Sequence, residues 1–482
     1  MQRRLAPSTR PISSVRIALL GGAFVSLMAS AEESAEKPVL TLQATDVQGE
    51  AYRPQTTEGS ASYTTGAMST AIGLPMSIRE TPQSVSVVTR QQIEDEGLSN
   101  TAQILDSAPG ISHVRNDSNR LSFSARGFTI DNFQFDGLAS PINGFWNFGA
   151  TEMDSAIYDR VEIVRGSTGL LTGAGSPSAA VNFVRKRPLP EFAASGSAGI
   201  GRWDERRGDV DVSAPLTEDG RIAARVVAAY SQKDSHVSYL DYGSRTLYGV
   251  VSSELGPRTR LTTSLEYQKN ETDGMGSGFP LFYKDGGRTD FGRSAANNTK
   301  WGYFGTESTT AFVDLEHQLE NDWKLRAAYS RFEGNYRMRY LYRGGYPDRE
   351  TGRGMSASFL KYEGERTRDD WHLTASGPFQ LLGRSHELAF GAMSIDDDLT
   401  IDPRNPAVGQ RGDPPADRGR GPEQHRADSR QRAGHFPCAQ RQQSPVVLGT
   451  WFHHRQLPVR RPGLADQRLL ELRRHRDGLG HL

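Results

Sequence analysis

The stretch YDRVEIVRGSTGLLTGAGSPSAAVNFVRKRP, from Tyr158 to Pro188, decides the fold of this chain. Short apolar segments in it alternate with glycine-rich turns, and it ends in a basic segment. Its part GLLTGAG resembles a phosphate-binding loop, but the Gly-Lys-Ser/Thr that such a loop requires does not follow. The stretch therefore predicts a compact domain of short strands and loops.

The residues before this stretch extend the same domain and predict a mixed α/β region from about 74 to 190. Ser84–Thr89 has the alternation of a strand, and a helix is expected from Gln91 to Glu96. A second helix, Thr101–Ser107, ends at the breaker pair Pro109-Gly110. Further strands are expected at Phe133–Asp136 and Val161–Val164.

The residues after Pro190 predict an antiparallel β-barrel. Segments of about ten residues alternate there between apolar and polar side chains, as transmembrane strands do. In Trp323–Ser330, Trp, Leu, Ala and Tyr fall on one face and Lys, Arg, Ala and Ser on the other. A soluble β-sandwich has the same alternation, so these segments alone leave both architectures open. Similar segments are 222–230, 247–255, 261–267, 309–319, 371–376 and 387–393, with a long loop at 274–300.

Three motifs upstream of Tyr158 connect the chain to a known family. ETPQSVSVVTRQQIEDEG (80–97), ILDSAPGIS (104–112) and FSARGFTIDNFQFDGL (123–138) stand in the order and spacing found in TonB-dependent outer-membrane receptors. The chain resembles ferric-siderophore receptors of the hydroxamate (coprogen) and pyoverdine type over roughly residues 40 to 395. This resemblance implies a mainly β fold, in which an N-terminal α/β plug domain (74–190) precedes a transmembrane antiparallel β-barrel.

The N-terminus is expected to be an export signal. Ile17–Ala29 is apolar but shorter than the roughly 20 residues that a membrane-spanning helix needs. Four arginines precede it, and Ala29-Ser30-Ala31 has the small-x-small pattern of a cleavage site. We therefore expect residues 1–31 to be a signal peptide, with a membrane anchor as the alternative. The resemblance implies the outer membrane of a Gram-negative bacterium as the destination.

Residues 32–73 are expected to form a flexible periplasmic segment. Within them Val39, Leu40, Thr41, Leu42, Gln43 and Ala44 alternate apolar and polar side chains, as a peptide does when it adds a strand to a partner's sheet. This hexamer resembles a TonB box, which implies the energy-coupling protein TonB as the partner. A featureless linker is the alternative.

The resemblance also implies a ligand and the residues that contact it. A ferric siderophore is polar and large, so it requires a pocket of aromatic faces and hydrogen-bond donors. Phe145, Trp146 and Asn147 are expected near that pocket. The long loop and its end add Phe279, Phe282, Tyr283 and Trp301. For each aromatic residue, packing in the plug or in a membrane-interface girdle is the alternative.

Six residues of two plug motifs are expected to be structural: Arg126, Gly127, Arg160, Glu162, Arg165 and Gly166. Charges that alternate along a plug strand can pair with carboxylates of the barrel wall and hold the plug in place. Direct contact of Arg126 with the ligand is the alternative.

Charge and composition exclude several classes of protein. Residues 32–401 hold 38 basic against 49 acidic residues, so the body is acidic and a nucleic-acid partner is not expected. The one cysteine, Cys438, excludes a disulfide framework. Since no catalytic motif or metal-ligand spacing is present, we expect neither an enzyme nor a bound cofactor or metal, but a monomeric receptor.

The last residues, 401–482, differ from the rest of the chain. They hold fifteen Arg and no Lys, whereas the last Lys and Tyr are Lys361 and Tyr362. The composition resembles a GC-rich gene translated in the wrong frame, with a disordered extension as the alternative. Barrels of this family have about 22 strands, and residues 191–400 have room for about half of them. We therefore expect an incomplete barrel that does not transport.

Two other functions are compatible with a barrel. A passive porin or adhesin-like barrel would lack the plug and the coupling peptide, and the plug motifs argue against it. A siderophore-sensing receptor would need an extra domain before the TonB box, whereas about eight residues separate Glu32 from Leu40.

Overall fold

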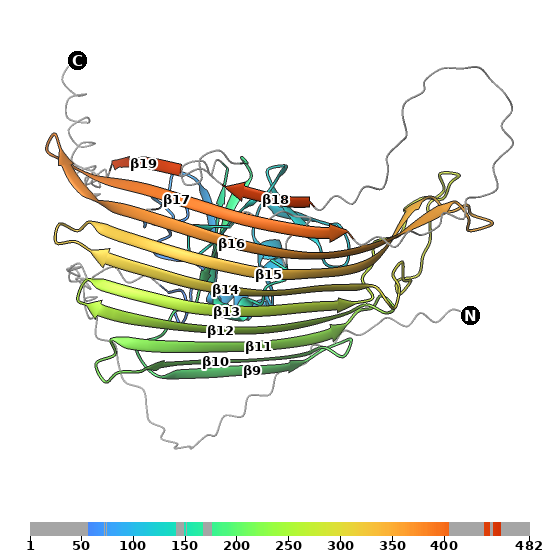
Figure 1. Cartoon of the computed structure of the whole chain (residues 1–482), viewed down its shortest axis with the longest axis horizontal. Coiled ribbons are helices and arrows are strands. Elements are labelled where there is room, and N and C mark those ends of the chain that lie inside the picture. The colour runs from blue at the N-terminus through green and yellow to red at the C-terminus, as the bar shows by residue number, and fades with distance from the viewer. Residues whose placement is uncertain are drawn as a thin grey trace, which may run out of the picture. The chain divides into compact units, whose positions relative to one another are not determined.

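The computed structural model describes residues 56–71, 73, 75–140, 149–150, 152–166 and 176–403, and two short strands at 438–443 and 447–454 (Figure 1). The predicted signal peptide and TonB box lie outside the described residues. No helix among the described residues is long and apolar enough to cross a bilayer.

The plug contains a five-stranded sheet in the order β1-β7-β8-β5-β6. Only the pairing of β5 with β8 is parallel. Seven of the eight residues of β7 are buried, including Asp159, Arg160 and Glu162, so its charged side chains need partners inside the protein. A smaller sheet has the order β2-β3-β4. The strands are β1 (Ser84–Thr89), β2 (Ile111–Arg115), β3 (Leu121–Ala125), β4 (Phe128–Thr129), β5 (Asn132–Phe135), β6 (Leu138–Ala139), β7 (Tyr158–Arg165) and β8 (Ala179–Arg185).

Two short helices follow β1, as the sequence predicted, and each has a capping side chain at its start. Helix α1 (Arg90–Asp95) begins after Thr89, whose side chain accepts a hydrogen bond from the amide of Gln92. Helix α2 (Thr101–Ser107) has Asn100 as its N-cap and ends before Pro109-Gly110. A single turn of 3-10 helix, η1 (Ser155–Ile157), leads into β7.

The larger sheet is antiparallel and runs in chain order from β9 to β17, each strand pairing with the one before it (Figure 1). Residues 191–403 form nine strands, slightly fewer than the half-barrel for which the sequence predicted room. β15, β16 and β17 are 22, 27 and 20 residues long, so the same residues make fewer strands. The strands are β9 (Ala193–Ile200), β10 (Arg206–Pro215), β11 (Ile222–Asp234), β12 (Asp241–Gly256), β13 (Thr259–Asp273), β14 (Tyr303–Gln318), β15 (Lys324–Gly345), β16 (Met355–Leu381) and β17 (Arg384–Pro403).

Two strands lie within the tail that the sequence separated from the barrel. β18 (Cys438–Gln443) pairs with Asp396–Ile401 of β17, and β19 (Val447–His454) pairs with His386–Met393 of the same strand. They bring the larger sheet to eleven strands. The regular pairing of β17 also extends to Pro403, a few residues beyond the predicted break.

The two faces of the larger sheet have opposite chemistry. On β13, Glu266, Gln268 and Asn270 are buried on the face toward the plug, while Leu265 points the other way and is 55% exposed. Trp371 on β16 is likewise 56% exposed and packs at a tilt against Tyr329. A soluble sandwich buries its apolar face instead. An exposed apolar face over many strands is the arrangement that lipid requires.

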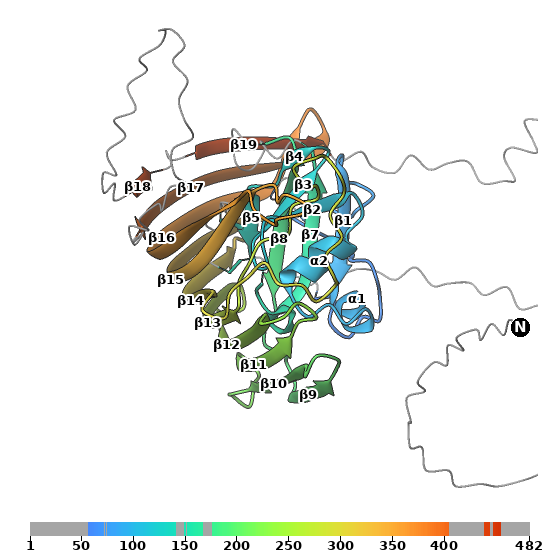
Figure 2. The ribbon, with the colours of Figure 1, turned by 90° about the vertical axis from the view of Figure 1, so that its right-hand side faces the viewer.

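The plug lies against the polar face of this curved sheet (Figure 2). Its core includes Ile104, Phe133 and Phe183, and the same cluster reaches Val227 and Tyr248 of the sheet. The Tyr248 hydroxyl donates a hydrogen bond of 2.9 Å to the carbonyl of Lys186 at the end of the plug. Plug and wall therefore share one core.

The exposed apolar face gives a first prediction. Leu265→Arg places a charge among lipid tails and should lower the free energy of unfolding in lipid vesicles by about 2–4 kcal/mol. Lys269→Arg, on the same face of the same strand but beyond Tyr267, is the control and should change little. Urea unfolding followed by tryptophan fluorescence measures both variants. Equal effects would show that this face does not contact lipid.

Candidate functional site

Three consecutive basic residues at the end of the plug, Arg185, Lys186 and Arg187, join it to three strands of the wall. We call them the exit triplet. Arg185 lies 2.8 Å from Glu266 on β13, and Lys186 lies 2.7 Å from Asp211 on β10. Arg187 lies 3.2 Å from Asp314 on β14. The plug is therefore bound to separate parts of the wall through its last residues.

Burial of these cations is compensated by their partners to different degrees. Desolvation alone would lower the pKa of Arg185, but Glu266 and Asp136 outweigh it and raise the pKa above its ordinary value. Desolvation prevails at Lys186, where nearby Arg90 adds to it, so the pKa of Lys186 is lowered despite Asp211. The paired carboxylates are what make these buried charges tolerable.

Further polar contacts hold the plug along β10, β13 and β15. Arg207 on β10 makes a bidentate pair with Asp154, at 2.7 and 2.8 Å. Arg326 on β15 donates to the carbonyl of Asp136 at 2.8 Å. Near the long loop, Asn119 of the plug donates to Thr272 on β13 at 2.5 Å.

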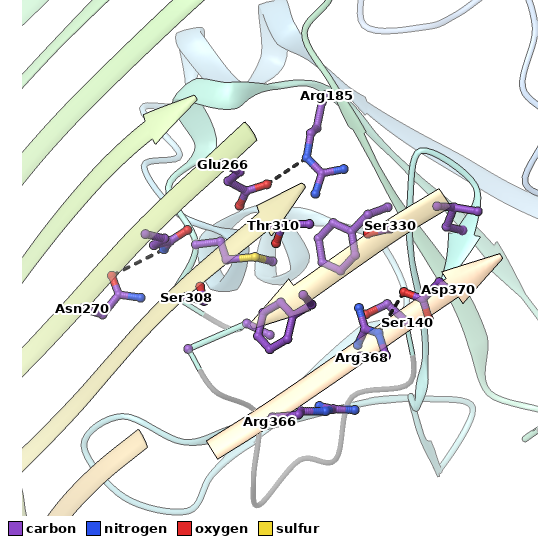
Figure 3. Close-up of a pocket in the computed structure, with 17 residues that line it drawn as sticks. Ser140, Arg185, Glu266, Asn270, Ser308, Thr310, Ser330, Arg366, Arg368 and Asp370 are labelled. Atoms are coloured by element: carbon purple, nitrogen blue, oxygen red, sulfur yellow. Dashed lines mark hydrogen bonds and ion pairs between the residues drawn. The ribbon is translucent and has the colours of Figure 1, made fainter. Parts of the chain in front are cut away.

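A pocket lies between the plug and strands β13 to β16 (Figure 3). Arg368 on β16 forms one wall, where it donates to Asp370 at 2.9 Å and lies 5.4 Å from the centre of the Phe332 ring. Two buried acceptors, Oε1 of Gln268 and Oδ1 of Asp370, have no hydrogen-bond partner among the described residues. The lining residues are Phe135, Leu138, Ser140, Gly149, Ala150, Met153, Arg185, Glu266, Gln268, Asn270, Ser308, Thr310, Ser330, Phe332, Arg366, Arg368 and Asp370.

This chemistry suits a polar organic ligand. Arg368 offers N–H donors beside an aromatic face, and the two oxygens without a partner among the described residues can accept hydrogen bonds from N–H or O–H donors. Close to the pocket, desolvation in the plug raises the pKa of Glu152 to about 7, and Asn119 donates to its carboxyl at 3.2 Å.

Of the residues predicted to contact the ligand, the four that the structure describes do not line this pocket. Phe145, Trp146 and Asn147 lie outside the described residues, although Ser140 and Gly149, on either side of that segment, do line it. The others lie in or beside the loop between β13 and β14 and pack on aromatic or cationic neighbours. Phe279 stacks on Phe291 at 4.2 Å, Tyr283 lies 4.6 Å under Arg349, Trp301 packs on Phe359 at 5.4 Å, and Phe282 is 48% exposed.

The charged plug residues chosen from the sequence have partners inside the plug rather than on the wall. Arg160 pairs with Asp159 and Glu162, each at 2.8 Å. Arg165 donates to the carbonyl of Pro109 at 2.7 Å and to Ser86 at 2.9 Å. These partners among the described residues therefore belong to the plug, where the sequence had suggested carboxylates of the barrel. Seven of the eight β7 residues are buried, and these partners of the two arginines come from β7 itself and from neighbouring plug segments.

Arg126, Gly127 and Gly166 shape a turn of the plug. Arg126 and Gly127 have φ angles of 54° and 83°. Gly166 has a φ of 112°, a backbone conformation that favours glycine, and a Cβ there would also lie 2.8 Å from Nη1 of Arg126, the flexible end of a side chain. Burial and nearby Arg126 lower the pKa of Arg165.

Sequence reasoning missed the exit triplet and the arginines of β16 as site residues. The signal for the triplet was visible, because Arg-Lys-Arg directly follows an apolar strand where the plug meets the barrel. The alternation of Arg366, Arg368 and Asp370 on one face of a strand was also visible. Only the pairing of strands shows that this face points to the plug.

Comparison with known proteins agrees with this architecture. The family described as TonB-dependent receptor plug domain matches residues 77–180. The ferripyoverdine receptor of Pseudomonas aeruginosa is 41% identical over 339 residues, which cover 70% of this chain and 41% of that receptor. A ferric-pyoverdine receptor of Pseudomonas putida is 38% identical, over 79% of this chain and 47% of that receptor.

Solved structures match in the same region. The alcaligin outer-membrane receptor FauA from Bordetella pertussis has a TM-score of 0.60 at 55% identity, over 73% of this chain and 53% of that one. The P. aeruginosa ferripyoverdine receptor bound to ferripyoverdine has a TM-score of 0.69 at 39% identity, over 72% and 46%.

The chain therefore carries the plug domain and part of the barrel of the TonB-dependent outer-membrane receptors. Within that class it is homologous to ferripyoverdine receptors. It spans about half the length of the curated relatives it matches.

The exit triplet gives a second prediction. Arg185→Leu leaves Glu266 and Asp136 buried without their cation and should lower the free energy of unfolding by about 3–5 kcal/mol. Adding Glu266→Leu should recover part of the loss. Arg221→Leu breaks an exposed pair with Asp219 and should change little. Urea unfolding compares the variants, and equal losses for Arg185→Leu and Arg221→Leu would contradict a holding role.

Proposed function

We propose that this chain comes from a receptor that takes up a ferric siderophore through the outer membrane of a Gram-negative bacterium. The observation that supports it best is a plug bound by buried ion pairs to the polar face of a lipid-facing sheet, with a polar pocket between them. The relatives named for pyoverdine and alcaligin point to siderophores as the ligand class. Iron is the cargo of such a chelate, not a resident metal.

The proposed energy source is TonB, acting on residues 39–44. The alternation in this hexamer suits strand addition to a partner, and tension on it would reach the plug through the residues that follow. No ATP-binding motif is needed for this mechanism. The receptor is proposed to work as a monomer, since one chain of this class supplies both plug and wall.

The proposed ligand contacts are Phe145, Trp146 and Asn147 and the loop residues Phe279, Tyr283 and Trp301. Tyr283 and Trp301 lie in and beside the loop between β13 and β14, and Trp301 is 41% exposed. Exposed aromatic faces at a loop can stack on a planar or amide-rich chelate. A passive porin is disfavoured, because its pore would hold no plug bound by buried ion pairs.

The proposed ligand class is tested by binding to the purified full chain. Ferripyoverdine and ferric alcaligin should quench its tryptophan fluorescence, and a ferric catecholate should not. Tyr283→Ala and Trp301→Ala should weaken binding by about tenfold, because each removes an aromatic contact surface.

The control for these variants is Tyr346→Ala, which removes an exposed tyrosine from the loop between β15 and β16 and should leave binding unchanged. Tight binding of the ferric catecholate, together with no binding of ferripyoverdine or ferric alcaligin, would exclude the proposed substrate class. If Tyr346→Ala weakens binding as much as Tyr283→Ala and Trp301→Ala do, Tyr283 and Trp301 are not ligand contacts.

We also propose that the reading frame changes near residue 400 and that this chain alone does not transport. The composition changes there, and the described wall has eleven strands where a closed barrel of this class needs about 22. An open sheet leaves unpaired peptide groups at its edges, and each costs several kcal/mol in lipid.

The frame change predicts that the gene, read in its other two frames from about codon 390 to 405 onward, encodes further amphipathic strands in one of them. Sequencing the gene from independent isolates checks this. Two patternless, stop-rich frames would contradict the frame change and leave residues 401–482 as native sequence.

A further inference from the structure

The first described residues of the chain are bound to the start of β7 by a single carboxylate. Oδ1 of Asp159 accepts hydrogen bonds from the Thr56 hydroxyl at 2.7 Å and from the amides of Thr57 and Glu58, each at 2.9 Å. The Thr57 hydroxyl also donates to the carbonyl of Asp159 at 2.9 Å. Thr57 and Asp159 are 2% and 3% exposed. This segment, Thr56–Glu58, follows the hexamer 39–44 in the chain.

Glu58 connects the same segment to the barrel wall. Its carboxylate makes a bidentate pair with Arg225 on β11, at 2.6 and 2.7 Å. Arg225 makes a second bidentate pair with Asp211 on β10, at 2.6 and 2.7 Å. Asp211 in turn lies 2.7 Å from Lys186 of the exit triplet. One charge network therefore links both ends of the plug to the wall.

The two ends are held unequally. If Glu58 leaves, Arg225 keeps its pair with Asp211, so no buried charge loses its only partner. The Glu58 side chain is 24% exposed and is already close to water. If the exit triplet leaves, contacts to three strands break together, and Glu266, with an 8% exposed side chain, loses Arg185. Removing the exit triplet is therefore much more costly than removing Thr56–Glu58.

We propose that Thr56–Glu58 is a releasable latch and that the exit triplet is a fixed anchor. Tension applied on the N-terminal side opens the contacts with Asp159 and Arg225 first, while the end of the plug stays on β10, β13 and β14. Asp159 and Arg225 are positioning residues that set the load at which the plug begins to move. The proposal rests on the proposed function for the source of the tension.

Hydrogen exchange of the full chain in detergent micelles, read by mass spectrometry, tests the proposal. Glu58→Gln and Asp159→Asn should each speed exchange of the amides of Thr57 and Glu58 by about tenfold, since each weakens a charge-assisted contact. Amides of β8 and the exit triplet should keep their rates. Asp211→Asn should speed exchange at both ends, because Asp211 serves Arg225 and Lys186.

The matched control is Asp219→Asn, which removes an exposed carboxylate at the β10–β11 turn and should change neither end. If Glu58→Gln speeds exchange at both ends equally, the ends open as one unit and the proposal is wrong. Unchanged exchange at Thr57 and Glu58 in Asp159→Asn would overturn it as well.

Pulling the chain from its N-terminus in a force spectrometer supplies the mechanical readout. The first rupture should fall to lower force in Asp159→Asn and Glu58→Gln, and later ruptures should be unchanged. If neither substitution changes the force of the first rupture, the latch proposal is contradicted. Neither experiment uses a siderophore, so failure to bind any chelate would overturn the proposed function and leave the latch result standing.

Discussion

The buried ion pairs between the exit triplet and the wall determine how the rest of the structure is arranged. Cations that lose their water need carboxylates at hydrogen-bonding distance, and Asp211, Glu266 and Asp314 supply them from three strands. Such pairs fix position more than they add stability, because desolvation offsets much of the attraction. β8 can end at only one place on the wall, and β5 and β7, which pair with β8, are placed with it.

The wall can offer those carboxylates because its faces are reversed relative to a water-soluble sheet. Charged and amide side chains of β13 point to the plug, while Leu265 of β13 and Trp371 of β16 point outward. The polar inner face needs partners in turn, and the plug provides them with Arg185, Arg207's partner Asp154 and the carbonyl of Asp136. The alternation of polar and apolar residues along the wall strands therefore has two consequences: one face suits lipid and the other face suits the plug.

Local signals in the sequence predicted the plug well and the wall less completely. β1 and α2 have the predicted bounds, because a capping side chain and a Pro-Gly pair determine where a helix can begin and end. Strand length in the wall depends on pairing with neighbours, so β16 extends to 27 residues although its amphipathic part is shorter. The partners of Arg160 and Arg165 depend on which strands flank β7, and no local pattern contains that information. For the same reason, the position of the β16 arginines at the pocket could not be predicted from the sequence.

The uneven strength of the plug's attachments bears on where a ligand could act. The pocket lies beside Arg185, at the anchored end, and its wall residues on β14 and β15 are mostly small hydroxyl side chains rather than charges paired with the plug. A contact without a buried ion pair can separate without leaving a buried charge unpaired. The plug therefore separates from β14 and β15 at the pocket at a lower free-energy cost than it does at the exit triplet. Ser140 and Gly149 bring two plug segments to the same place, which means that a molecule in the pocket touches plug and wall together. A ligand there would therefore contact the plug beside its anchor, at Arg185, rather than at the Thr56–Glu58 latch.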